Sequence, residues 1–187
     1  MTLDKPTFRR NCLQKLKNRA LHNSYYRSSL VNIKLIKLLK LQKRKKILFY
    51  YPLAMEVNIV KVLNSLRKKH DIYIPFMVGQ SFKMVPFRLP LRKKKFGIYE
   101  AGNTLRNIKK IDIAIVPVVG VDGNLQRVGF GKGMYDRFFE KLEKKPYIIF
   151  TQRELCFTKK SICDNYDIDG DILITPLKDI KKKNRKK

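Results

Sequence analysis

Apolar residues recur along the chain with two periods, and the period indicates which element each segment forms. Spacings of three and four residues predict four helices: Lys5 to about Ala20, Ser24 to about Leu41, a segment bearing Val60, Leu63 and Leu66, and one that begins near Gly133. In the second helix, Leu30, Ile33 and Ile36 are expected to face the core.

Short apolar runs between these helices predict strands at 47–51, 72–74, 82–87, 111–117, 147–150 and 172–175. Pro52 and Pro75 are expected to end the first two strands, and the third is expected to be exposed. Because strands alternate with helices, the sequence predicts a three-layer α/β/α sandwich with a mostly parallel, doubly wound sheet. One domain is expected over residues 1–180, with ligands at the carboxyl ends of the strands.

The charge of the chain is strongly positive. The 187 residues include 43 lysines and arginines against 15 acidic residues, a formal charge of +28. Such an excess attracts polyanions, so nucleic acid is a possible partner. The cations are dispersed in short runs, however, and a solvated lysine surface explains them equally well. Residues 181–187 are expected to be a disordered basic tail.

Other features limit the classes of protein. There is no run of about eighteen apolar residues and no apolar signal core, so we expect a cytoplasmic protein without membrane contact, acting as a monomer. Cys12, Cys156 and Cys163 lack the close spacing of metal or redox pairs, so free buried thiols are expected. The two histidines, His22 and His70, do not suggest a zinc site or a catalytic triad.

The segment 122–137 combines glycines with charges. Gly129, Gly131 and Gly133 alternate, which allows close backbone approach and aims several amides at one point, as in phosphate-binding loops. The helix that follows would add its positive end. Arg127 and Lys132 would supply cations, and Asp136 could hold a divalent metal against the phosphates. The alternative is a tight turn that only needs glycine.

Two familiar phosphate loops do not fit this segment. A Walker loop ends in Gly-Lys-Ser/Thr, which is missing here. A dinucleotide fingerprint places its first glycine directly after a strand, whereas about a dozen residues separate Pro117 from Gly129. The pattern Arg127-Val128-Gly129-x-Gly131-Lys132-Gly133-x-Tyr135-Asp136-Arg137 instead resembles the central motif of the 5-formyltetrahydrofolate cyclo-ligase family.

The resemblance extends over nearly the whole chain. The pair Lys5 and Arg9, the segment Tyr51 to Val57, the residues Met84 and Phe87, and the segment Asp167 to Thr175 are similar to family features in the same order. The sequence departs from the family at Ala101, Val121 and Met134, and the interval from Gln152 to Asp167 is longer than expected.

The resemblance implies an ATP- and Mg²⁺-dependent ligase that converts 5-formyltetrahydrofolate to 5,10-methenyltetrahydrofolate. The implied ATP site comprises Lys5, Arg9, Arg127, Gly129, Phe130, Gly131, Lys132, Gly133, Met134 and Tyr135, with Arg127, Lys132 and Asp136 as catalytic residues. The implied folate site comprises Tyr51, Glu56, Met84, Phe130, Met134 and Tyr135, and the implied metal ligands are Asp136 and Asp171.

Several of these residues also have structural interpretations. Lys5 and Arg9 could form a solvated helix face, Glu56 could favour a helix N-terminus, Asp171 could cap a turn that enters a strand, and Tyr135 could pack in the core. At the level of the whole chain, the alternatives are a basic nucleic-acid-binding protein on the same scaffold and a different ATP-using or sugar-phosphate enzyme.

Overall fold

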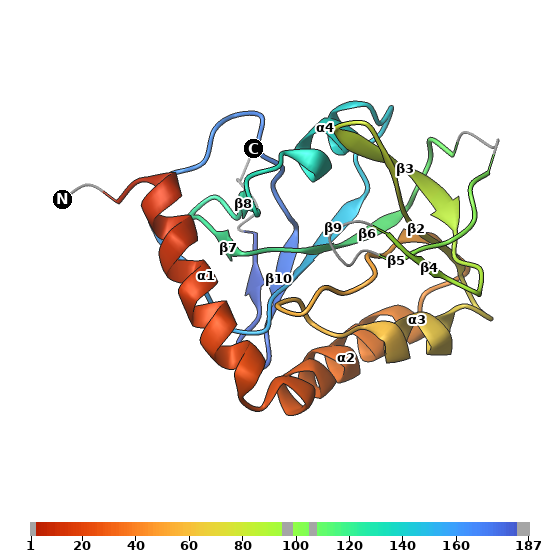
Figure 1. Cartoon of the computed structure of the whole chain (residues 1–187), viewed down its shortest axis with the longest axis horizontal. Helices are drawn as coiled ribbons and strands as arrows, with labels where there is room; N and C mark the ends of the chain where they lie inside the picture. The colour runs from red at the N-terminus through yellow and green to blue at the C-terminus, as the bar shows by residue number, and fades with distance from the viewer. Residues whose placement is uncertain (1–2, 95–98, 105–107, 183–187) are drawn as a thin grey trace.

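The computed structural model describes residues 3–94, 99–104 and 108–182 (Figure 1). The helices are α1 (Lys5–Leu21), α2 (Ser24–Lys40), α3 (Val60–Leu66) and α4 (Met134–Glu140). The strands are β1 (Lys46–Leu48), β2 (Asp71–Val78), β3 (Ser81–Pro86), β4 (Arg92–Lys93), β5 (Tyr99–Glu100), β6 (Ile113–Pro117), β7 (Gly120–Val121), β8 (Arg127–Val128), β9 (Tyr147–Thr151), β10 (Ile172–Ile174) and β11 (Ile180–Lys181).

A seven-stranded sheet in the order β11-β10-β9-β6-β1-β2-β3 forms the middle of the molecule. Strands β10, β9, β6, β1 and β2 run parallel, and the edge strands β3 and β11 are antiparallel to their neighbours. The predicted mostly parallel sheet is therefore confirmed. β6 is buried along its whole length, as its unbroken apolar sequence predicts.

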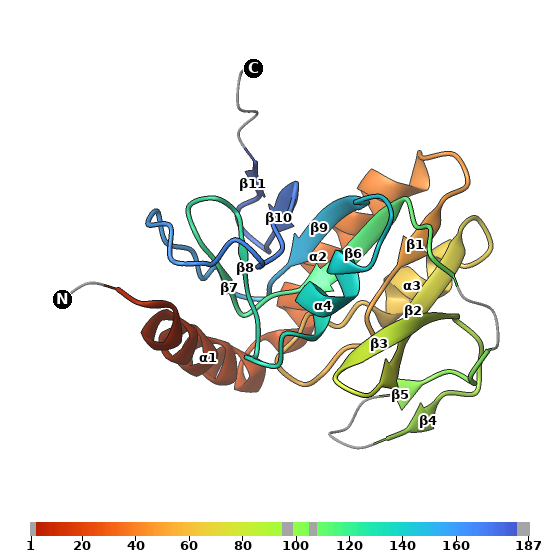
Figure 2. The same cartoon turned by 90° about the horizontal axis from the view of Figure 1, so that it is seen from above.

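Helices cover both faces of the sheet (Figure 2). On one face, Leu35 of α2 and Leu63 of α3 join the core cluster of Ile47 and Ile115. On the other face, Phe138 of α4 stacks on Phe82 at a centroid distance of 4.3 Å. A smaller cluster lies under α1. This arrangement confirms the three-layer α/β/α sandwich in one domain.

The buried stripe of α2 differs from the prediction. Val31, Leu35 and Leu39 are buried, whereas Ile33 is 63% exposed. A helix turns through 200° in two residues, so Ile33 must point away from a core that Val31 faces. The prediction is therefore wrong for Ile33, whereas Ile36 is partly buried and packs against the core cluster, as predicted.

Strand β2 also differs from the prediction, because it continues through Pro75 to Val78. Its pairing with β1 ends at Tyr73, and Pro75 pairs only with Met84 of β3. A proline is tolerated where one side of the strand has no ladder partner. Strand β3 is mostly buried and not exposed. Strands β4 and β5 form a short antiparallel ribbon outside the main sheet.

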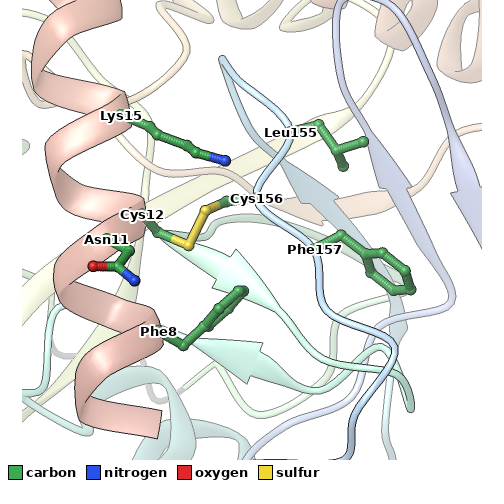
Figure 3. A pocket seen from close by; sticks show the side chains of 7 residues that line it. All are labelled: Phe8, Asn11, Cys12, Lys15, Leu155, Cys156 and Phe157. Carbon is green, nitrogen blue, oxygen red and sulfur yellow. A yellow bond between two sulfur atoms is a disulfide. The ribbon is translucent and has the colours of Figure 1, made fainter. Parts of the chain in front are cut away.

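The cysteines correct another expectation. Cys12 of α1 and Cys156, in the segment after β9, form a disulfide that joins two segments 144 residues apart (Figure 3). Cys163 is a free thiol, and burial raises its pKa to about 12. The expectation of free thiols is therefore wrong for Cys12 and Cys156.

The carboxyl-terminal end of the described chain is ordered further than expected. Lys181 belongs to β11 and pairs with Ile172, and the backbone amide of Lys182 donates to the Asp171 carbonyl oxygen. The remaining tail residues, 183–187, lie outside the described residues. Within the described ranges, no helix has the length and apolar character needed to span a bilayer.

Candidate active site

Arg127 lies at the centre of the glycine-rich segment, on the short strand β8. Its backbone amide donates to the Ile168 carbonyl oxygen at 2.8 Å, and its Nε donates to the Pro117 carbonyl oxygen, at the carboxyl end of β6, at 3.1 Å. The side chain is 6% exposed, and its guanidinium lies 4.8 Å from the Tyr135 ring centroid. Burial lowers the pKa of Arg127, although the nearby charge of Asp136 opposes this shift. A preorganised cation is thus held at the carboxyl edge of the sheet.

The glycines of the loop have distinct roles. A Cβ at Gly129 would lie 2.2 Å from Nη1 of Arg127, so the guanidinium needs glycine there. Gly131 and Gly133 adopt φ values of 90° and 60°, which other residues rarely adopt. The helix α4 has only seven residues, so the predicted contribution from its dipole is small. Backbone amides and cationic side chains must therefore provide the contacts to any bound anion.

Helix α1 brings its two predicted residues to this loop. Nε of Arg9 donates to the Gly129 carbonyl oxygen at 2.9 Å. Lys5 forms ion pairs with Asp167 and Asp164, the latter at 3.0 Å. Lys5 and Arg9 are both half-buried, so they do not form a solvated helix face. The disulfide at Cys12 joins the same helix to the segment after β9.

The exposed Lys132 is held through its backbone. Arg137 donates to the Lys132 carbonyl oxygen and, from its Nε at 3.0 Å, to the Gln80 carbonyl oxygen in the β2–β3 turn. The Lys132 side chain is exposed. The loop is therefore fixed at both ends, by Arg9 and by Arg137, while the Lys132 ammonium extends toward solvent.

The two predicted metal ligands are not placed alike. The Ile168 amide donates to Oδ1 of Asp136 at 3.2 Å, which joins α4 to the segment that contains Asp167. Asp171 instead accepts from the Ile148 amide at 2.7 Å, where β9 and β10 begin. That is the amino edge of the sheet, opposite the edge where Arg127 bonds to Pro117, so Asp171 acts as a strand-entry cap. Asp167 precedes Ile168 in the sequence, and its charge and that of Asp136 both act on Arg127.

Glu56 lies in the loop between β1 and α3. Its Oε2 accepts from the Leu53 amide at 2.8 Å. Burial raises the pKa of Glu56 to about 7, and the charges of Arg127 and Arg153 act in the opposite direction. Glu56 precedes α3 by several residues, so its role is not to stabilise that helix N-terminus. It is a carboxyl group that can change its charge near neutral pH.

Sequence reasoning missed Arg153. This arginine is 3% exposed, and it donates from Nη1 to the Ala54 carbonyl oxygen at 2.9 Å and from Nη2 to the Glu56 carbonyl oxygen. Its position two residues after β9 was the signal in the sequence, because the carboxyl ends of parallel strands carry functional groups.

The predicted walls of the folate site are dispersed. Tyr51 is half-buried and its ring lies 5.2 Å from that of Tyr99. Met84 is 1% exposed inside the sheet–α4 core, so it does not line an open surface. Met134 and Tyr135 pack against that same cluster, whereas Phe130 packs against the cluster under α1. The structure therefore brings Tyr135, but not Met84, to Arg127.

Two hollows lie away from the glycine loop. One, of about 460 Å³, is beside the disulfide and is lined by Phe8, Asn11, Cys12, Lys15, Leu155, Cys156 and Phe157 (Figure 3). The other, of about 480 Å³, is lined by residues that include Lys46 and Glu143, at the amino edge of the sheet. Neither hollow is lined by a residue of the predicted ATP, folate or metal site.

Comparison with known proteins identifies the family. A sequence model described as the 5-formyltetrahydrofolate cyclo-ligase family matches residues 1–176. The 5-formyltetrahydrofolate cyclo-ligase of Mycoplasma pneumoniae is 26% identical over 176 residues, which cover 92% of this chain and 98% of that protein. The enzyme of the same name from Haemophilus influenzae is 25% identical over 122 residues, which cover 60% of this chain and 65% of that protein.

Solved structures agree with this match. The NMR structure of Aquifex aeolicus 5,10-methenyltetrahydrofolate synthetase superposes with a TM-score of 0.80 at 25% identity, covering 98% of this chain and 95% of that one. The Mycoplasma pneumoniae synthetase shares the fold with a TM-score of 0.71 at 22% identity, covering 93% and 99%. The family model covers the glycine loop together with Arg9 and Arg137, which hold it. The chain therefore belongs to the 5-formyltetrahydrofolate cyclo-ligase family.

Proposed function

We propose that this protein catalyses the ATP- and Mg²⁺-dependent cyclisation of 5-formyltetrahydrofolate to 5,10-methenyltetrahydrofolate, with release of ADP and phosphate. Family membership supports the reaction class. The single observation that carries the proposal is the convergence of Arg9 and Arg127 on Gly129. Two guanidinium groups and a glycine backbone at one point suit a polyphosphate better than a neutral ligand.

The nucleotide end of the proposed site would use fixed and mobile cations. Arg127 is locked by its bond to Pro117, and Arg9 by its bond to Gly129, so neither must be ordered when ATP binds. Lys132 is exposed and could close over the phosphates. The amides from Gly129 to Gly133 would complete the contacts.

Asp136 and Asp167 would hold Mg²⁺ in the proposed site. Mg²⁺ is commonly bound by one or two carboxylates plus substrate phosphates. The described residues contain no group of three or more acidic, cysteine or histidine ligands, so bound phosphates would have to complete the coordination of Mg²⁺. The Lys5 ammonium against Asp167 shows that this carboxylate accepts a cation. When bound, Mg²⁺ would neutralise phosphate charge.

Glu56 would receive the pterin end of the folate. The pterin presents neighbouring N–H groups, and an ionised carboxylate accepts two such hydrogen bonds. Tyr51, Phe130, Met134 and Tyr135 supply apolar surface near the two ends of the site. Met84 can act only from beneath, as core packing.

The chemistry requires a better leaving group than a formamide oxygen. Transfer of the γ-phosphoryl group to the formyl oxygen breaks the bond to ADP and activates the formyl carbon. The side-arm nitrogen of the folate then attacks that carbon, loses its proton and expels phosphate. Such a site needs alignment and charge neutralisation, which Arg127, Arg9 and Lys132 would supply.

Turnover of the purified chain tests the proposal. The protein is mixed with ATP, Mg²⁺ and 5-formyltetrahydrofolate, and the absorbance of the methenyl product is followed. Omission of each component should abolish the signal. If protein shown to be folded gives no product, the proposal fails. Steeply salt-dependent binding to RNA or DNA would then favour the nucleic-acid alternative, which at present rests on the charge of +28.

A further inference from the structure

Arg153 is a buried cation without an acidic partner among the described residues. Its side chain is 3% exposed, and Nε has no hydrogen-bond partner there. The neighbouring Glu154 is paired with Arg27 at 2.6 Å and with Arg19 at 3.1 Å. Burying a charge is costly unless it is compensated, and burial indeed lowers the pKa of Arg153. Its retention in the fold calls for a compensating role.

The contacts of Arg153 concentrate on one loop. The two terminal nitrogens donate to the carbonyl oxygens of Ala54 and Glu56, on either side of Met55. The loop joins β1 to α3 and has little regular structure, so few backbone hydrogen bonds hold it. A planar guanidinium that bonds two carbonyls fixes both position and orientation.

The base of Arg153 is itself well anchored. Nε2 of Gln152 donates to the Val119 carbonyl oxygen at 2.6 Å, and Oε1 accepts from the Cys156 amide at 2.9 Å. The disulfide ties Cys156 to α1. One rigid segment, 152–156, therefore reaches both the helix that carries Arg9 and the loop that carries Glu56.

We propose that Arg153 is a positioning residue for the folate end of the site, fixing the Ala54–Glu56 loop so that the Glu56 carboxylate faces the substrate. This inference rests on the proposed function. Arg153 acts through Glu56 and does not itself contact the reacting atoms. A purely structural tie would stabilise the fold without selecting one substrate.

Two substitutions separate these roles. Arg153→Met keeps an apolar stem but removes the charge and both hydrogen bonds. Arg153→Lys keeps the charge but lacks the planar guanidinium that bonds both carbonyl oxygens. We expect Arg153→Met to raise KM for 5-formyltetrahydrofolate about tenfold or more, the scale of a misplaced binding group, and to leave KM for ATP within about twofold. Lys34→Met is the control, because Lys34 also donates to a carbonyl oxygen, that of Thr175, and pairs with Asp179 instead of bonding to the Ala54–Glu56 loop.

The pH profile gives a second readout. Arg127 from β8 and Arg153 both lower the pKa of Glu56 against the effect of burial. Burial raises the pKa of Tyr50 and Tyr135, and the Glu56 charge acts on both in the same direction. Because the positive charge of Arg153 lowers the pKa of Glu56, its removal should raise that pKa further. The pH below which KM for folate increases should therefore move upward in Arg153→Met. It should stay near the wild-type value in Arg153→Lys.

A double-substitution cycle with Glu56→Gln decides whether Arg153 acts through Glu56. If it does, Arg153→Met should have little further effect on KM for folate in the Glu56→Gln background. Equal effects in both backgrounds, or a normal KM and pH profile in folded Arg153→Met, would overturn the inference. If Arg153→Met does not fold, Arg153→Lys decides by the same cycle. An inactive wild-type protein would refute the proposed function instead.

Discussion

The guanidinium carbon of Arg127 lies 4.8 Å from the centroid of the Tyr135 ring. The pair joins β8 to α4 across the glycine loop, so the cation keeps one orientation whether or not a ligand is present. Burial with an aromatic face on one side and the Pro117 carbonyl oxygen on the other leaves little freedom. If the glycine loop binds phosphate as proposed, Arg127 needs no reordering when the anion arrives.

Removal of this cation should slow turnover strongly. We expect Arg127→Ala and Asp136→Ala each to lower kcat by about a hundredfold or more, the usual effect of losing one preorganised charge. Steady-state kinetics and thermal unfolding of the same preparations give the measurement. Near-normal rates in both folded variants would show that the glycine loop is not the phosphate site.

Aspartate substitutions at the two edges of the sheet should change the Mg²⁺ requirement differently. Asp136→Asn and Asp167→Asn should raise the Mg²⁺ concentration needed for half-maximal rate about tenfold or more. Asp171→Asn should leave the Mg²⁺ requirement unchanged and cost about 1 kcal/mol of stability, through its weakened bond to the Ile148 amide. Magnesium titrations read by initial rate, with denaturant unfolding, distinguish these cases. An altered Mg²⁺ requirement in Asp171→Asn would support Asp171 as a metal ligand, as the sequence implied.

At pH 8, the ionised Glu56 carboxylate should lower the stability of the folded state while it supports folate binding. Its pKa is about 7 in the folded protein against 4.5 without the fold, so the folded state holds a proton that the unfolded state has lost between these values. Stability from this group therefore falls as pH rises from 4.5 to 7. At pH 8, Glu56→Gln should melt at a higher temperature than wild type, while its KM for folate rises about tenfold.

Melting curves of both proteins from pH 5 to 8 test the first half of this prediction. The two midpoints should converge toward pH 5, where wild-type Glu56 is also neutral. A difference that does not change with pH would mean that Glu56 keeps its ordinary pKa.

Gly131 and Gly79 form a matched pair. Both have positive φ, 90° and 57°, and neither would meet an atom closer than 3.8 Å if given a Cβ. Alanine at either position should cost about 1 kcal/mol through backbone strain. Only Gly131→Ala should also raise KM for ATP, because Gly131 lies beside Arg9 in the loop. An equal effect of Gly79→Ala on KM for ATP would contradict this.

The sequence predicts how residues lie within a short segment better than it predicts contacts between distant segments. Arg127 and Asp136 lie in one continuous motif, so their placement followed from a short segment. Asp167 and Asp171 are four residues apart, and only the start of β10 decides which of them stays near Asp136. Periodicity could not choose the buried face of α2, because Ile33 and Val31 are equally apolar.

The contacts that were missed join distant parts of the chain. Arg153 bonds to a carbonyl oxygen 97 residues earlier, and Cys12 pairs with a cysteine 144 residues later. No spacing rule links such positions, since both depend on how the sheet brings its carboxyl edge against α1 and the β1–α3 loop. Only the tertiary structure provides them.

Helix α1 is made before the rest of the described chain, yet two of its cations contact residues made much later: Arg9 bonds to Gly129, and Lys5 pairs with Asp167, 162 positions on. During synthesis, Lys5 and Arg9 lack these partners until most of the chain has emerged. An interrupted translation product that stops before β9 would hold the glycine loop but have no second carboxylate. We therefore expect catalytic competence to arise late and in one step.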